Sequence, residues 1–133
     1  MSGTGVISAR SSAMWVGGVV ATLVGLFHVV PAPEYLAKQP YLGVMFLLGG
    51  LGPIAAAIVM VVPAFPAGLR RLAIALTAFA CALMIVFGVL SRITGLPGLD
   101  REPWDALILI SLVLEAAFLS LTPTLLRTRR RIN

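Results

Sequence analysis

Four runs of apolar residues, each about as long as a lipid bilayer is thick, dominate this sequence and limit what it can fold into. The runs cover residues 13–30, 41–62, 72–90 and 104–126, and short polar or Pro/Gly-containing segments join them. A helix needs about 20 mostly apolar residues to cross the hydrocarbon core, so each run is a candidate membrane span. We therefore predict an all-α protein, a four-transmembrane-helix bundle without a soluble domain.

The composition supports a membrane protein. Hydrophobic residues make up 59% of the 133 residues and charged residues 11%, against about 25% charged in soluble domains. The single cysteine, Cys81, lies inside the third run, so one chain can build neither a disulfide framework nor a cysteine metal site. The net charge of +5 does not indicate nucleic acid as a partner, because the arginines cluster at the predicted membrane boundaries.

Basic residues are unevenly divided between the two predicted ends of the bundle. With four spans, both termini lie on the same side as the connection between the second and third spans. Seven basic residues fall on that side and three on the other, which predicts that both termini are cytoplasmic. The seven are Arg10, Arg70, Arg71, Arg127, Arg129, Arg130 and Arg131, and the three are Lys38, Arg92 and Arg101.

Two polar segments flank the predicted bundle. Residues 1–12 are rich in Ser and Gly and are expected to form a flexible N-terminal tail. Residues 127–133 form a basic C-terminal tail, in which each arginine near the surface can contribute about 1 kcal/mol to the binding of anionic lipid headgroups. The arginines assigned to headgroup contact are Arg127, Arg129, Arg130 and Arg131.

A carboxylate near the middle of the last span is the strongest indication of a functional site. At 100° per residue, Glu115 falls within about 40° of Ser111 and Thr122, so the three form a narrow polar stripe on an apolar helix. A charged side chain at the bilayer centre costs about 2.5–3.5 kcal/mol, so such a carboxylate is normally paired, protonated or turned towards water. We expect the stripe to face protein.

Further ionisable residues gather near one mouth of the predicted bundle. His28, the only histidine, lies near the end of the first span. Glu34 follows in a Pro-rich loop expected to lie along the interface, with Tyr35 and Tyr41 as its anchors. The imidazole either hydrogen-bonds to a carbonyl or headgroup, or forms a polar cluster with Glu34. Glu102 precedes the last span and Asp105 lies just inside it, where both suit the positive end of its helix dipole and a capping role. The candidate ligand or proton site comprises Glu115, His28, Glu34, Arg92, Asp105 and Ser111; no metal site is assigned.

Small residues mark the predicted contacts between helices. In the first span they recur every four residues, which is typical of close helix packing. In the second span, glycines beside a proline predict a kink next to such a contact or, alternatively, a widened pocket for a lipid, quinone or cofactor. The residues assigned to packing are Gly17, Ala21, Gly25, Gly49, Gly52 and Pro53.

Two short motifs resemble a family of small four-helix integral membrane proteins found in actinobacteria and related bacteria. The first, His-x4-Pro-Glu-His/Tyr, is formed here by His28, Pro33, Glu34 and Tyr35, and the second, Ser-Arg-x-x-Gly-Leu-Pro, covers residues 91–97. The family often has a second histidine where this chain has Tyr35. The absence of that histidine here argues against a metal site. The resemblance implies a four-helix fold and no established activity. With the charge distribution, it predicts a multi-pass protein of the bacterial inner membrane.

Two classes of function fit these features. Since the sequence shows no Ser/His/Asp set, metal-ligand spacing or phosphate-binding loop, we expect a non-catalytic subunit or scaffold that packs with other membrane subunits or with itself. The alternative is a small-molecule, lipid/quinone or proton-coupled transport site centred on Glu115 in a homo-oligomer. A membrane enzyme is the least favoured class, because Cys81 is expected to be buried and inert. The sequence identifies no cofactor.

Overall fold

Five helices make up the protein between residues 3 and 127, the part that the computed structural model describes, with side chains described from residue 12 onward. The helices are α1 (Gly3–Val29), α2 (Ala32–Lys38), α3 (Pro40–Val61), α4 (Ala67–Ile93) and α5 (Ala106–Arg127).

Four helical segments of the described chain are long and apolar enough to cross a membrane. α3, α4 and α5 supply one each, and α1 together with α2 supplies the fourth, which runs from Ser12 to Lys38. The prediction of an all-α chain with four helices long and apolar enough to span a membrane is therefore confirmed for the described residues.

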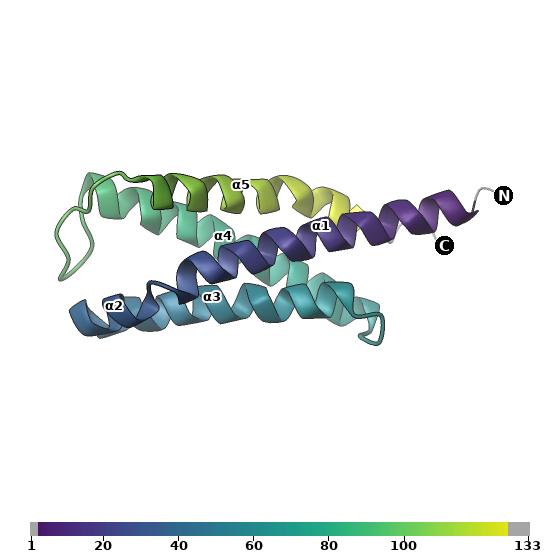
Figure 1. The fold of residues 1–133 in the computed structure, drawn as a ribbon, viewed down its shortest axis with the longest axis horizontal. Coiled ribbons are helices and arrows are strands. Elements are labelled where there is room, and N and C mark those ends of the chain that lie inside the picture. The colour runs from purple at the N-terminus through teal and green to yellow at the C-terminus, as the bar shows by residue number, and fades with distance from the viewer. Residues whose placement is uncertain (1–2, 128–133) are drawn as a thin grey trace.

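The long helices form a ring in which each one packs against two neighbours. α1 packs on α3, α3 on α4, α4 on α5, and α5 closes the ring on α1. Figure 1 shows α2 and the α4–α5 loop at one end of the bundle, called the α2 end below. The α3–α4 turn, the start of α1 and the end of α5 lie at the other end, called the terminal end (Figure 1).

The interior between the helices is mainly apolar, and so is much of the outer surface. Many large apolar side chains, such as Leu48, Phe79 and Val113, are exposed on the outside of the ring, as expected where lipid replaces water as the solvent. The main buried cluster consists of Met14, Ala21, Val24, Ala57, Met60, Ile74, Cys81, Phe118 and Leu125.

Glycines allow α1 and α3 to approach each other closely. A Cβ on Gly50 would lie 2.8 Å from both the carbonyl oxygen of Gly25 and the backbone nitrogen of Val29, so this crossing tolerates no side chain. A Cβ on Gly17 would lie 2.6 Å from Met60, and Ala21 is completely buried. The small residues of α1 therefore lie at helix contacts.

The second span departs in part from the predicted packing. A Cβ on Gly49 would lie 3.2 Å from Met84 of α4, and Pro53 is buried within α3, which continues through it. Gly52, by contrast, lies on the exposed face of α3, where a Cβ would meet no atom within 4 Å. Gly52 does not pack against another helix of this chain, because two residues turn the direction by about 200° from that of Gly50.

The segments outside the apolar runs also differ from the predictions. α1 already begins at Gly3, so most of the segment expected to be a flexible tail continues the helix; it contains no proline to interrupt it. The expected interfacial loop contains α2, with Pro33 in its first turn, where a missing N–H costs nothing. Arg127 ends α5 and is exposed. The other arginines assigned to lipid contact, Arg129, Arg130 and Arg131, lie outside the described residues.

Candidate functional site

The carboxylate of Glu115 on α5 forms the buried centre of the site. The residue is 1% exposed, and its Oε1 accepts a hydrogen bond of 2.9 Å from the hydroxyl of Ser111, one turn earlier. Oε2 is also buried and has no hydrogen-bond partner among the described residues. Thr122, the third residue of the predicted stripe, donates instead to the carbonyl of Phe118 in its own helix. The polar stripe thus faces protein at Ser111 and Glu115.

His28 on α1 is the partner of this carboxylate. Its Nε2 lies 3.4 Å from Oε1 of Glu115, and the residue is 8% exposed. Its Nδ1 lies 2.8 Å from the carbonyl oxygen of Val24, one turn earlier on α1. A carbonyl oxygen can only accept a hydrogen bond, so Nδ1 carries a hydrogen and Nε2 is the nitrogen that faces Glu115. Below, His28 and Glu115 are called the buried pair.

The geometry of the buried pair determines how it can share protons. A neutral imidazole with its hydrogen on Nδ1 presents a lone pair at Nε2, and an ionised carboxylate presents one at Oε1. Two lone pairs that face each other in a buried site repel, so the pair is favoured with one proton between them. That proton lies either on the carboxyl group or on Nε2, and the pair has no net charge in either form. Its loss would leave an uncompensated buried negative charge, which is costly.

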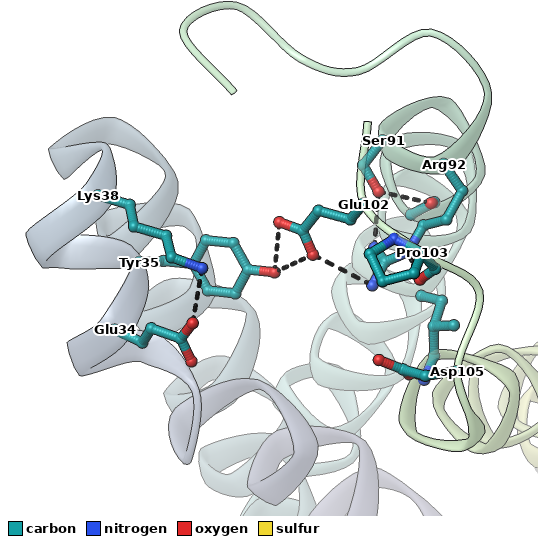
Figure 2. Close-up of polar contacts among 10 residues, drawn as sticks. Glu34, Tyr35, Lys38, Ser91, Arg92, Glu102, Pro103 and Asp105 are labelled. Atoms are coloured by element: carbon teal, nitrogen blue, oxygen red, sulfur yellow. Dashed lines mark hydrogen bonds and ion pairs between the residues drawn. The ribbon is translucent and has the colours of Figure 1, made fainter. Parts of the chain in front are cut away.

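A second group of polar residues lies at the α2 end and is called the outer cluster below. The hydroxyl of Tyr35 on α2 lies 2.8 Å and 2.6 Å from the two carboxylate oxygens of Glu102, which precedes α5 (Figure 2). Nη2 of Arg92 lies 3.4 Å from Oε2 of Glu102, and Nη1 donates to the hydroxyl of Ser91 at 2.6 Å. The side chains of Arg92 and Glu102 are only 11% and 18% exposed. The outer cluster therefore ties α2 to α4 and to the α4–α5 loop.

The α4–α5 loop has the backbone geometry that this contact requires. Gly95, with φ of 77°, ends α4, and Gly98, with φ of 76°, follows Pro97 in a turn. The flanking residues Leu96 and Leu99 exchange two backbone hydrogen bonds across this turn. Proline second and a positive-φ glycine third are typical of a type II turn. The Gly-Leu-Pro part of the second motif is thus explained by the shape of the loop.

Phe46 on α3 lies between the outer cluster and the buried pair. Its ring is stacked on that of Tyr35, with centroids 4.3 Å apart and planes inclined by 7°. The same ring lies 5.4 Å from the imidazole of His28, centroid to centroid. Two aromatic contacts therefore connect α2 to the buried pair.

The structure separates two predicted site residues from the rest. Glu34 is exposed and pairs with Lys38 one turn later on α2, at 2.6 Å, so the expected cluster of His28 with Glu34 does not form (Figure 2). Asp105 is exposed, and its Oδ1 accepts a hydrogen bond of 3.0 Å from the backbone N–H of Ile108. Asp105 therefore caps α5, as one of the sequence alternatives proposed, and does not reach the buried pair.

Three residues that shape the site were not identified as site residues from the sequence. Tyr35 was expected to anchor the interface, Glu102 was assigned to capping, and Phe46 was not singled out. Tyr35 does belong to the first motif, and Glu102 follows the second within a few residues. A contact between the two motifs could therefore have been considered, since both lie at the same end of the bundle.

The site consists of one buried histidine–carboxylate pair and one hydrogen-bonded cluster. Among the residues that the structure describes, no group of three or more His, Cys, Asp or Glu side chains could hold a metal ion. Comparison of the chain with protein-family models, with curated proteins and with solved structures finds no match.

Proposed function

We propose that this protein binds and releases a proton at the buried pair within the membrane, the property that a proton-coupled transporter needs. The observation that supports this most directly is the 3.4 Å contact between Nε2 of His28 and Oε1 of Glu115, with Nδ1 held by a backbone carbonyl. Ionisable residues inside membrane spans have a high free-energy cost of insertion, and where they occur they commonly mark proton relays and substrate pathways. Because a single bundle of this size has too few helices to enclose a transport pathway, we propose that the transporting unit is a homo-oligomer.

We also propose the orientation of the protein in the bacterial inner membrane. Arg70 and Arg71 lie at the terminal end of the bundle, together with Arg127 at the end of α5, whereas Lys38 and Arg92 lie at the α2 end. Cytoplasmic segments carry more basic residues, so the terminal end is placed in the cytoplasm. The outer cluster would then face the opposite side of the membrane.

Infrared difference spectroscopy at two pH values tests the proton site. The purified protein is reconstituted in lipid vesicles. The C=O stretching band of protonated carboxyl groups is then followed as the pH is raised. We place the shared proton on the carboxyl group of Glu115, because both members of the buried pair are then neutral. We therefore expect a band that disappears at high pH and is absent from Glu115→Gln. Because Gln can still accept a bond from Ser111, this variant is expected to fold. His28→Gln should move the pH at which the band disappears.

Glu34→Gln is the matched control, because it removes an exposed carboxylate and should leave the buried band unchanged. If the spectra of the unmodified protein and Glu115→Gln were the same at every pH, the buried pair would bind no exchangeable proton and the proposal would be wrong.

A second candidate function is a non-catalytic subunit of a larger membrane complex. The exposed face of α3 around Gly52 favours it, because a Cβ at this position would meet no atom within 4 Å. A helix of another protein could approach α3 closely there. Chemical cross-linking in native membranes tests this: Gly52→Leu should abolish a specific cross-linked species without changing the helix content. An unchanged cross-linking pattern would exclude a partner at this face.

A further inference from the structure

Polar side chains are unevenly distributed along the interior of the bundle. Between the α2 end and the middle of the bundle, polar side chains form first the outer cluster and then the buried pair. Towards the terminal end, the buried polar side chain on α4 is Thr77, whose hydroxyl donates to the carbonyl of Ala73 in its own helix. The partly buried hydroxyls of Thr22 and Thr122 likewise donate to carbonyls of their own helices, and the other neighbours in that part of the core are apolar. They include Val24, Met60, Cys81, Phe118 and Leu125.

This distribution determines from which end a proton can reach Glu115. Apolar side chains neither donate nor accept hydrogen bonds, so a tightly packed apolar core does not conduct protons. On the side of the α2 end, the ring of Phe46 lies between the outer cluster and the buried pair, stacked on Tyr35 and 5.4 Å from the imidazole of His28. The end of the bundle with the outer cluster is therefore the entrance, and Phe46 is the barrier within it.

The ring of Phe46, on α3, also contacts the short helix α2. Phe46 stacks on Tyr35 of α2, and α2 is a separate helix of seven residues between Pro31 and Gln39. The bonds from Tyr35 to Glu102 and from the Gln39 side chain to the carbonyl of Gly98, at 2.8 Å, hold α2 against the α4–α5 loop. Breaking them would release Tyr35 from the α4–α5 loop, while α2 remains packed on α3 and the four-helix ring stays in place.

We propose that Tyr35 and Phe46 form a gate over the buried pair, and that Glu115 communicates with the α2 end alone, when the contact between Tyr35 and Glu102 opens. The functional role of this gate rests on the proton site proposed above. The route by which solvent reaches Glu115 can nevertheless be tested separately, because it does not depend on whether Glu115 titrates.

Cysteine accessibility measures this access directly. Ser111→Cys is introduced next to Glu115 in a Cys81→Ala background, and a charged, membrane-impermeant thiosulfonate reagent is applied to sealed vesicles of known orientation. Glu34→Cys, exposed on α2, identifies the face that corresponds to the α2 end. We expect slow labelling of Ser111→Cys from that face and none from the other.

Opening the gate should accelerate this labelling. Tyr35→Phe removes only the hydroxyl that binds Glu102, and we expect labelling about tenfold faster, as for the loss of one hydrogen bond from the closed state. Phe46→Leu, which cannot stack on Tyr35, should act in the same direction. Thr77→Cys is the matched control on the terminal side of Glu115, and it should stay unlabelled in every background.

Equal labelling rates of Ser111→Cys in all three backgrounds, or labelling from the terminal face, would overturn the gate. Failure of the proton site has a different signature: the infrared band would be missing while gated labelling persists. A lost gate with a retained band would leave the proton site intact and refute only the access route.

Discussion

Nε2 of His28 and Oε1 of Glu115 lie 3.4 Å apart inside the bundle, one on α1 and the other on α5. Both residues are buried, and each is the polar neighbour that makes the burial of the other tolerable. The contact also joins the two ends of the chain, because α1 and α5 are the helices that close the ring. The buried pair is thus a structural contact as well as a candidate proton site.

Removing one member of the buried pair should destabilise the fold more than removing both. His28→Leu leaves Oε1 with Ser111 alone, and we expect a loss of about 1–3 kcal/mol in the free energy of unfolding, as for a buried polar group deprived of its partner. Replacing both residues by leucine should recover most of this loss, because well-packed apolar replacements of a buried pair are often neutral or stabilising. Unfolding in mixed detergent micelles, followed by circular dichroism, gives the four free energies of the cycle.

The coupling between the two sites is the decisive quantity in this cycle. We expect it to lie between about 0.5 and 3 kcal/mol, the range for residues in contact. Additive effects of the two substitutions would mean that the contact contributes nothing to stability.

The sequence was sufficient to predict the four spans and the inward orientation of Glu115, because bilayer thickness and helical periodicity determine both. It did not predict the partner of Glu115. The Pro-rich segment after His28 predicts that the first span ends there, which places His28 at the mouth of the bundle. In the structure α2 continues the first crossing to Lys38, so His28 lies well inside it, at the depth of Glu115. Local propensity does not reveal whether a helix resumes after a proline.

Charge assignments at the α2 end were harder still. Glu102 and Asp105 both suit the start of a helix, and the sequence offers no way to decide which one caps it. The structure gives the cap to Asp105, which leaves Glu102 free to reach Tyr35 on another helix. Such cross-helix contacts depend on the path of the loop, which in turn depends on the positive φ angles of Gly95 and Gly98.

The crossing of α1 and α3 should be sensitive to a single methyl group. In Gly50→Ala, the new Cβ would clash with Cγ2 of Val29 and lie 2.8 Å from the carbonyl oxygen of Gly25, so the helices must separate. We expect a loss of about 1–3 kcal/mol in the free energy of unfolding, the range for overpacked cores. Gly52→Ala, two residues away on the open face, should be neutral or gain up to about 1 kcal/mol from helix propensity. Similar losses in both variants would contradict the close crossing.

Loss of the Tyr35 hydroxyl should loosen α2 without unfolding the bundle. Tyr35→Phe keeps the stack on Phe46 but removes both contacts to Glu102, and we expect a loss of about 0.5–1.5 kcal/mol. Hydrogen–deuterium exchange should accelerate at the amides of α2 and remain unchanged in α5. Glu34→Gln breaks the pair with Lys38, whose side chains are 64% and 49% exposed, and should have little effect. Uniform acceleration across all helices would show that the hydroxyl supports the whole fold.

Asp105 provides the final prediction, because its capping role and a role in the proton site have different consequences. Asp105→Ala removes the acceptor for the N–H of Ile108, and we expect a loss of about 0.5–2 kcal/mol in the free energy of unfolding. Asp105→Asn retains a side-chain oxygen at the cap and should restore nearly all of it. The buried infrared band should be the same in both variants, since an exposed residue at the α2 end does not touch the buried pair. A band that shifts in Asp105→Asn while stability is preserved would place Asp105 in the proton site after all.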